Sequence, residues 1–437
     1  MSLSYALGRA GMGRRAARVA VSCGRSFSTA IAEAPTPAVA KIGGPAAWTK
    51  DGLLANKWWG YELEPALLAD LDGALEHSKT CAIEWAGDVP LNVSQSNFPL
   101  KALGRTIDQM SDELENGGGA AMIANIPVHK YSIEELSVIY LGICAYVGNV
   151  VQQSSAGLRS KTRGYGMPLG HVKAEMRGKT PLDGKQSNNY FRLHTDRCDM
   201  ISLLSVRTAS QGGHGRVASA VAIHDAMVER APDLVPLLYS PIERIWEGGE
   251  GVIALPIWAF EEGSGKFTTQ ISPSYIENAQ YVHGVRSLTD GEVEAIDLIE
   301  EIGLEIGHDF LQAPGQLTFL NNHLVYHGRT AWKFAEAHEV ADTRDNVENG
   351  RLLLRAWVSP FNSRPLPDTP AFREMWGDVR PGVPRGGLEP AIKAGIKSKP
   401  PELVEAYTSG KADYYGLYKR SFDGEDVTFG AASAATP

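Results

Sequence analysis

Two histidines and one aspartate are the residues of this chain best suited to hold a metal ion. His194 and Asp196 are separated by one residue, and His327 follows the aspartate by 131 positions. Two imidazoles and one carboxylate can bind a divalent iron on one face and leave the opposite face open, as in non-haem Fe(II) oxygenases. Alternate residues of a strand point to the same side, whereas a helix would separate the first two side chains by about 200°. The pair therefore predicts an extended segment.

A His-x-Asp pair on its own is a weak indication of a metal site. Chance matches are expected in a chain with 11 histidines and 51 acidic residues, and the alternative is a surface histidine hydrogen-bonded to its neighbour. Residues 190–193 and 201–206, which flank the pair, are consistent with strands. Two further segments, residues 316–329 and 351–355, make the metal interpretation stronger.

These two segments resemble motifs of the taurine dioxygenase-like (TauD/TfdA) enzymes. Residues 316–329 resemble the region that carries the distal histidine ligand of that family. Arg351 and Arg355 resemble its paired arginines, four residues apart on the last strand. The motifs occur in the family's order, and the resemblance extends from about residue 100 to about residue 362. Residues 44–48 are similar to fungal members of the clavaminate synthase-like group.

The resemblance implies a ligand set and two anion contacts. It makes His194, Asp196 and His327 the Fe(II) ligands, with 2-oxoglutarate as cosubstrate and O₂ as oxidant. Arg351 would bind the distal carboxylate of 2-oxoglutarate, because a guanidinium can donate two parallel hydrogen bonds to it. Arg355 would bind an anionic group of the primary substrate; the alternative is that it pairs with a buried acid. Positions four apart on one strand face the same side, so both arginines can point inward.

Several neighbouring residues are expected to stay outside the ligand set. His323 precedes the variable residues of the family's distal-histidine template, so we expect a loop or strand-edge side chain. Cys198 is expected to be a buried neighbour of the metal, and His214 to lie in a turn. Gly215 stands where relatives often carry a threonine or serine that helps to hold 2-oxoglutarate. That contact is either missing or supplied elsewhere, for example by Ser219.

Many short strands with a few helices predict a mainly β fold with flanking helices, a double-sheet jelly-roll barrel. The resemblance implies the same clavaminate synthase-like double-stranded β-helix. We expect helices from Pro65, at 100–115, at 132–147 and after Thr289, the last two from capping-box patterns. Strands are expected at 120–128, 189–207, 215–223, 242–247, 252–258, 267–271, 315–320 and 351–358. Residues 157–185 are expected to form a loop over the site, and the polar residues 333–350 an inserted surface loop.

The first 32 residues differ from the rest of the chain. They hold five arginines and no acid, which is the pattern of a mitochondrial transit peptide and predicts a location in the mitochondrial matrix; the alternative is a basic tail. The expected organisation continues with a linker and helical segment at 33–118, the dioxygenase core at 119–362 and a C-terminal extension with a disordered tail at 363–437.

Composition limits the function classes. The chain of 437 residues is 43% hydrophobic and 21% charged, as in ordinary globular proteins. Without the first 32 residues the basic count falls from 42 to 37 against 51 acidic residues, a net charge of about −14, which argues against a nucleic-acid partner. No run approaches the roughly 20 apolar residues of a membrane span. The four cysteines are widely spaced, which favours reduced thiols.

We therefore expect an Fe(II)- and 2-oxoglutarate-dependent dioxygenase that hydroxylates a small anionic or amino-acid-like metabolite. Two alternatives remain open at this point. One is a protein that binds metal and 2-oxoglutarate as a sensor, which Gly215 and the long insertion make conceivable. The other is a cupin-like metalloenzyme without a 2-oxo acid, which Arg351 and Arg355 weigh against. The sequence specifies neither the substrate nor the oligomeric state.

Overall fold

The computed structural model describes residues 39–153, 166–173, 176–177, 180–181, 190–209, 211–245, 251–333, 350–390 and 401–409. The chain divides into a first unit, residues 1–37, and a second unit, residues 38–437. The predicted transit peptide and most of the 333–350 insertion lie outside the described residues. Within the described ranges, no helix is long and apolar enough to cross a membrane.

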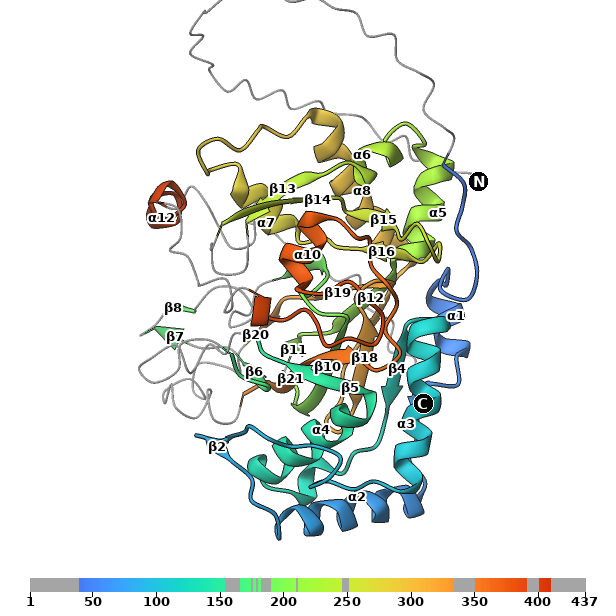
Figure 1. The fold of residues 1–437 in the computed structure, drawn as a ribbon, viewed down its shortest axis with the longest axis vertical. Helices are drawn as coiled ribbons and strands as arrows, with labels where there is room; N and C mark the ends of the chain where they lie inside the picture. The colour runs from blue at the N-terminus through green and yellow to red at the C-terminus, as the bar shows by residue number, and fades with distance from the viewer. Residues whose placement is uncertain are drawn as a thin grey trace, which may run out of the picture. The chain divides into compact units, whose positions relative to one another are not determined.

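Two mainly antiparallel sheets form the centre of the second unit (Figure 1). The larger sheet runs in the order β1 (Trp59–Tyr61), β4 (Ala120–Ile123), β18 (Leu317–Asn321), β10 (Met200–Arg207), β21 (Leu352–Pro360) and β5 (Gly148–Val151), with β6 (Gly170–Val172) also paired to β21. The smaller sheet runs in the order β17 (His308–Phe310), β12 (Gly215–Ser219), β19 (Val325–Arg329) and β9 (Phe191–His194). The sheets share one apolar core, in which Ile201 and Trp357 of the larger pack with Val217 and Val325 of the smaller.

The remaining strands form two-stranded sheets outside these two. They are β2 (Trp85–Ala86) with β3 (Val89–Pro90), β7 (Met176–Arg177) with β8 (Thr180–Pro181), β11 (Gln211–Gly212) with β20 (Trp332–Lys333), β13 (Ile242–Ile245) with β14 (Val252–Leu255), and β15 (Trp258–Phe260) with β16 (Phe267–Thr269).

Helices cover both sheets. On the larger sheet lie α3 (Ala102–Asn116) and α4 (Ile133–Val147), with α2 (Pro65–Ser78) packed on these two helices. On the smaller lie α5 (Ala220–Arg230) and α8 (Asp290–Ile306), with α6 (Val235–Tyr239) packed on these two. The first three gather at one end of Figure 1 and the last three at the other. The shorter helices are α1 (Lys50–Ala55), η1 (Val128–Lys130), α7 (Pro273–Ala279), α10 (Pro370–Trp376) and α12 (Pro401–Thr408). Both predicted capping boxes are present, one at the start of α4 and one at the start of α8.

The alternation of β21 explains how one strand serves both the core and the site. Leu354, Ala356 and Val358 face the cluster that packs against α2, α3 and α4. Arg355 and Trp357, one residue out of phase, face the other side of the sheet, where the smaller sheet lies. Because side chains alternate along a strand, the pattern that buries the apolar face also directs the polar residues inward.

Several predicted elements were wrong in their extent. The strand expected at 120–128 ends at Ile123, and that expected at 252–258 is divided between β14 and β15. The strand expected at 189–207 is divided into β9 and β10 by a turn at residues 195–199. The strand expected at 215–223 ends at Ser219, whose hydroxyl accepts a hydrogen bond from Ala222 N (2.8 Å) and starts α5. Residues 157–185 are not only loop, because β6 pairs with β21 as an edge strand. In addition, β19, which carries His327, is a strand that the pattern did not indicate.

Candidate metal centre

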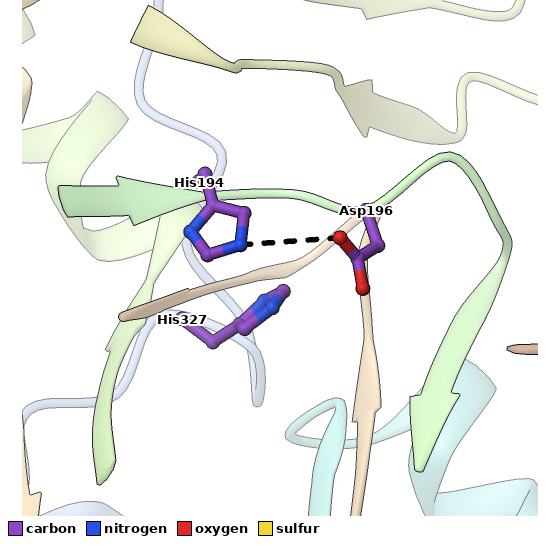
Figure 2. A group of neighbouring side chains, drawn as sticks. All are labelled: His194, Asp196 and His327. Carbon is purple, nitrogen blue, oxygen red and sulfur yellow. Dashed lines mark ion pairs between the residues drawn. The ribbon is translucent and has the colours of Figure 1, made fainter. Parts of the chain in front are cut away.

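The smaller sheet places the two histidines opposite each other. His194 ends β9, and it lies directly across from His327 in the antiparallel pairing with β19. The two imidazole centroids are 4.2 Å apart. Asp196 follows β9 by two residues, and its Oδ1 is 3.9 Å from His194 Nε2 (Figure 2). One ligand atom from each of the three residues lies within 4.8 Å of the other two.

The turn that carries Asp196 is fastened on two sides. Thr195 exchanges backbone and side-chain hydrogen bonds with Ile271, at 2.8 to 3.1 Å. Asn322 accepts a hydrogen bond from Asp196 N (3.2 Å) and donates one to Cys198 O (2.9 Å). These bonds fix the turn where the chain passes from the smaller to the larger sheet. The asparagine of the distal-histidine segment is therefore a positioning residue for the aspartate.

The hydrogen bonds of His194 define its tautomer. Its Nδ1 lies 2.8 Å from Arg192 O. A carbonyl oxygen only accepts, so Nδ1 carries the proton and Nε2 keeps a lone pair directed toward Asp196. The guanidinium of Arg192 is held in turn by Glu277 (2.6 Å). For His327, Nδ1 is buried and has no hydrogen-bond partner in the described structure.

The charges of the three groups suit a divalent cation. Burial lowers the pKa of His194, and burial together with the neighbouring His194 lowers the pKa of His327 to about 3. Burial opposes ionisation of Asp196, but Arg355 and the two imidazoles outweigh it and hold its pKa at about 2. Two neutral imidazoles and one carboxylate are the protonation state in which a metal binds. The residues present therefore fit an iron ion.

Two residues of β21 hold the other carboxylate oxygen of Asp196. Trp357 Nε1 donates to Asp196 Oδ2 at 2.8 Å, and Arg355 Nη1 lies 3.2 Å from the same atom. Arg355 Nε also donates to Gln153 Oε1 at 2.7 Å. Oδ1 is left facing His194. Trp357 was not among the predicted site residues, although its place two positions after Arg355 on one strand indicates the same face.

A cavity opens beside these groups. Its empty space, including the part that is open to solvent, is about 740 Å³. Its wall includes His194 and Asp196 from the triad, Arg355 from β21 and Arg244 from β13. A metal held by the triad would therefore have its remaining coordination positions next to a space that can admit a substrate.

The chain matches the family described as "Taurine catabolism dioxygenase TauD, TfdA family" over residues 87–357. The chain belongs to this family. FR-33289 synthase of Streptomyces rubellomurinus is 26% identical over 77% of this chain and 95% of its own length. Taurine hydroxylase-like protein SAT17 of Stachybotrys chartarum is 24% identical over 65% of this chain and 74% of its own. The membership confirms the predicted enzyme class, the Fe(II)/2-oxoglutarate-dependent dioxygenases.

A solved structure confirms the fold. Asparagine oxygenase in complex with Fe(II), 2S,3S-3-hydroxyasparagine and succinate superposes with a TM-score of 0.50 at 13% identity, over 69% of this chain and 93% of its own. The predicted double-stranded β-helix of the TauD/TfdA family, with helices on both sheets, is therefore the fold of this chain.

Arg351, the predicted 2-oxoglutarate contact, precedes β21 and does not line the cavity that Arg355 lines, so the prediction of two arginines on one strand was wrong for Arg351. It is 7% exposed and packs against Gly213, where an added Cβ would come within 3.2 Å of Arg351 Nε. Burial and the nearby Arg329 lower the pKa of Arg351 to about 9. No carboxylate of the described residues pairs with it. A buried guanidinium without a paired carboxylate favours an anion beside it.

The structure gives the other singled-out residues structural contacts. His323 lies in the turn between β18 and β19, in line with the expected loop position and outside the ligand set. It is nevertheless buried, with Asp199 at 2.7 Å from its Nε2 and Thr268 at 2.6 Å from its Nδ1. The Cys198 thiol donates to Met200 O (3.2 Å), as expected of a buried neighbour. The backbone of His214 pairs with Thr330 beside β12.

The hydroxyl suggested as a replacement at Gly215 is committed elsewhere. Ser219 is buried, donates to Ala46 O (2.5 Å) and caps α5, so this suggestion was wrong. At Gly215 an added Cβ would meet the ring of Phe310 at 3.0 Å. The aromatic ring therefore explains locally why a glycine stands where relatives carry a threonine or serine.

Proposed function

We propose that this enzyme hydroxylates an aliphatic carbon of a small anionic, amino-acid-like metabolite, with Fe(II) held by His194, Asp196 and His327. The convergence of these three ligands beside a cavity carries the proposal. Iron, 2-oxoglutarate and O₂, when bound, place one oxygen atom in the product alcohol and the other in succinate, with release of CO₂. The asparagine oxygenase complex, with hydroxyasparagine and succinate, supports an amino-acid-like substrate.

The chain's own groups orient the ligands. Arg192 O fixes the proton of His194 on Nδ1, so Nε2 is available to the metal. Trp357 and Arg355 hold Asp196 Oδ2, which leaves Oδ1 on the histidine side. Binding through one carboxylate oxygen leaves coordination positions for a bidentate 2-oxo acid and for O₂.

Arg351, which precedes β21, and Arg355, which lies on it, have separate parts in this proposal. Arg351 binds the distal carboxylate of 2-oxoglutarate; its burial without an acidic partner supports this part. Arg355 lines the cavity and presents positive charge to an anionic substrate while it steadies Asp196. Its ion pair with Asp196 was the alternative that we left open, and one guanidinium has enough donors for both contacts.

The proposal is tested by turnover in the presence of Fe(II), ascorbate and 2-oxoglutarate labelled at C1. Straight-chain amino acids with neutral or acidic side chains are added one at a time. We expect at least one amino acid to increase the release of labelled CO₂ and to be converted to a product 16 mass units heavier, in an amount equal to the CO₂ released. With Asp196→Ala we expect neither the CO₂ release nor the product. Iron-loaded protein that forms no succinate with any of them would favour a sensor, and O₂ consumption without 2-oxoglutarate would favour a cupin-like reaction.

We further propose that residues 1–32 direct the chain to the mitochondrial matrix. The acid-free, arginine-rich composition supports this.

A further inference from the structure

Arg244 is a buried cation in the wall of the cavity that contains the metal triad. It lies on β13 (Ile242–Ile245), is 2% exposed, and lines the same cavity as His194 and Asp196. No motif pointed to it, because β13 is outside both the His-x-Asp and the distal-histidine segments. Its charge is nevertheless one of the few that the cavity wall offers to a substrate.

The contacts of Arg244 leave its charge without an acidic partner. Nη1 donates to Gln270 O (2.6 Å) and Nη2 donates to Leu255 O (2.5 Å), which are both neutral carbonyls. The third donor, Nε, is buried and has no hydrogen-bond partner. No carboxylate of the described residues pairs with this guanidinium. Burial lowers its pKa to about 9, as expected of a cation that no neighbouring anion compensates.

Three other buried arginines of the described residues are compensated by a carboxylate. Arg192 pairs with Glu277 at 2.6 Å, Arg364 with Glu115 at 2.8 Å, and Arg385 with Asp199 at 2.8 Å. Leaving a charge in the interior without a partner costs several kcal/mol by the general rule for buried ions. Such a cation at a cavity wall is expected to be completed by an anion from outside the chain.

The wall beside Arg244 suits an acidic group on a short carbon chain. Gln270 also lines the cavity, and its buried Oε1 has no partner, so it can accept a hydrogen bond from a donor group elsewhere on the ligand. Ile245, Ile253 and Met375 supply apolar surface in the same wall. Arg355 also presents positive charge to this space, but it pairs with Asp196 and Gln153, whereas Arg244 has no acidic partner among the described residues.

We propose that Arg244 binds the acidic group of the primary substrate, a carboxylate or a similar oxyanion, and so anchors the carbon chain beside the metal. This inference rests on the proposed function, since it takes the cavity as the substrate site. The anion that Arg244 binds is distinct from 2-oxoglutarate, whose distal carboxylate is assigned to Arg351.

The test is anaerobic calorimetry on the full chain loaded with Fe(II) and 2-oxoglutarate. The probes are the straight-chain carboxylates from propanoate to heptanoate and the matching neutral amides. We expect at least one carboxylate to bind about tenfold or more tightly than its amide, as for hydrogen bonds to a charged group. Arg244→Met should remove this preference, and Arg244→Lys should retain part of it. Arg286→Met should keep the preference for carboxylates, because Arg286 is half-exposed, pairs with Glu292 and lies outside the cavity wall.

The iron–2-oxoglutarate charge-transfer band, recorded on the same samples, separates the outcomes. The inference is supported if every variant shows the band and the preference for carboxylates is lost in Arg244→Met, reduced in Arg244→Lys and kept in Arg286→Met. A preference that survives in Arg244→Met, or wild-type protein that does not distinguish carboxylates from amides, would overturn it. A band weakened in Arg244→Met alone would assign Arg244 to 2-oxoglutarate and also overturn it. Absence of the band from wild-type protein would instead count against the proposed function. If Arg244→Met does not fold, the comparison of wild-type protein with Arg244→Lys decides: a reduced preference for carboxylates in Arg244→Lys supports the inference, and an unchanged preference overturns it.

Discussion

Trp357→Phe is expected to weaken Fe(II) binding while the fold is retained. The substitution removes the 2.8 Å hydrogen bond from the indole Nε1 to Asp196 Oδ2 and keeps an aromatic ring in the shared core of the two sheets. Asp196 would then be held by Arg355 alone, through a longer contact of 3.2 Å. The carboxylate would be free to rotate away from the orientation that directs Oδ1 toward His194.

The size of the effect follows from the type of bond. A hydrogen bond to a charged acceptor contributes about 1.5–3 kcal/mol, and about 1.4 kcal/mol corresponds to a factor of ten in an equilibrium constant. The expected loss of Fe(II) affinity is therefore about tenfold to a hundredfold, which is also the range for removal of groups that orient metal ligands. The smaller ring should cost about 1–2 kcal/mol of stability through packing.

The affinity would be measured by anaerobic Fe(II) titration against a competing chelator, with the unfolding midpoint in urea as the stability control. Trp48→Phe is the matched substitution: its indole is also buried and donates a 2.6 Å hydrogen bond, but to Gly118 O. We expect Trp48→Phe to lose stability and keep its Fe(II) affinity. Equal Fe(II) affinity of Trp357→Phe and wild-type protein would refute the idea that this hydrogen bond orients Asp196.

Three further predictions concern other parts of the chain. Gly213 has a φ of 71°, and a Cβ added there would contact Arg351. Gly213→Ala should therefore raise the KM for 2-oxoglutarate several-fold and cost about 1 kcal/mol of stability, with Fe(II) affinity unchanged. An unchanged KM would argue against Arg351 as the cosubstrate contact. Burial lowers the pKa of His323 to about 4, whereas the pKa of a histidine in the unfolded chain is near 6.5. Between about pH 4 and pH 6.5 the unfolded chain therefore binds more protons than the folded chain. Stability should therefore rise with pH from about 4 to 6.5, by on the order of 3 kcal/mol, and urea unfolding of His323→Gln should lack this part of the dependence. Residues 1–32 fused to a fluorescent protein should direct it to mitochondria, and a diffuse distribution would support the basic-tail alternative.

Features with a local physical cause could be predicted from the sequence. The capping boxes at Ser132 and Thr289 are formed by residues three positions apart, so the starts of α4 and α8 followed from short patterns. Arg355 lies on the inward face of the last strand, as the alternation predicted, whereas Arg351 precedes β21 and does not line the same cavity. His194 and Asp196 required an extended segment, and the structure provides the end of β9 and the turn after it.

Features that depend on tertiary packing could not be predicted. Residues 220–223 are apolar and read as a strand, but the Ser219 hydroxyl caps them as a helix. Arg244 becomes a site residue only because β13 and the segment around Gln270 are folded against the metal turn, and nothing in its own neighbourhood signals this. The enclosure of His323 likewise depends on Asp199 and Arg385, which lie more than 50 residues away in the chain.

The most direct test of the metal centre is the visible charge-transfer band of the full chain mixed anaerobically with Fe(II) and 2-oxoglutarate. The variants are His327→Ala and, as a matched control, His323→Gln, which changes the neighbouring buried histidine that contacts Asp199. We expect the band in wild-type protein and in His323→Gln, and no band in His327→Ala. A band that persists in folded His327→Ala would contradict it, because the third ligand would then be another residue.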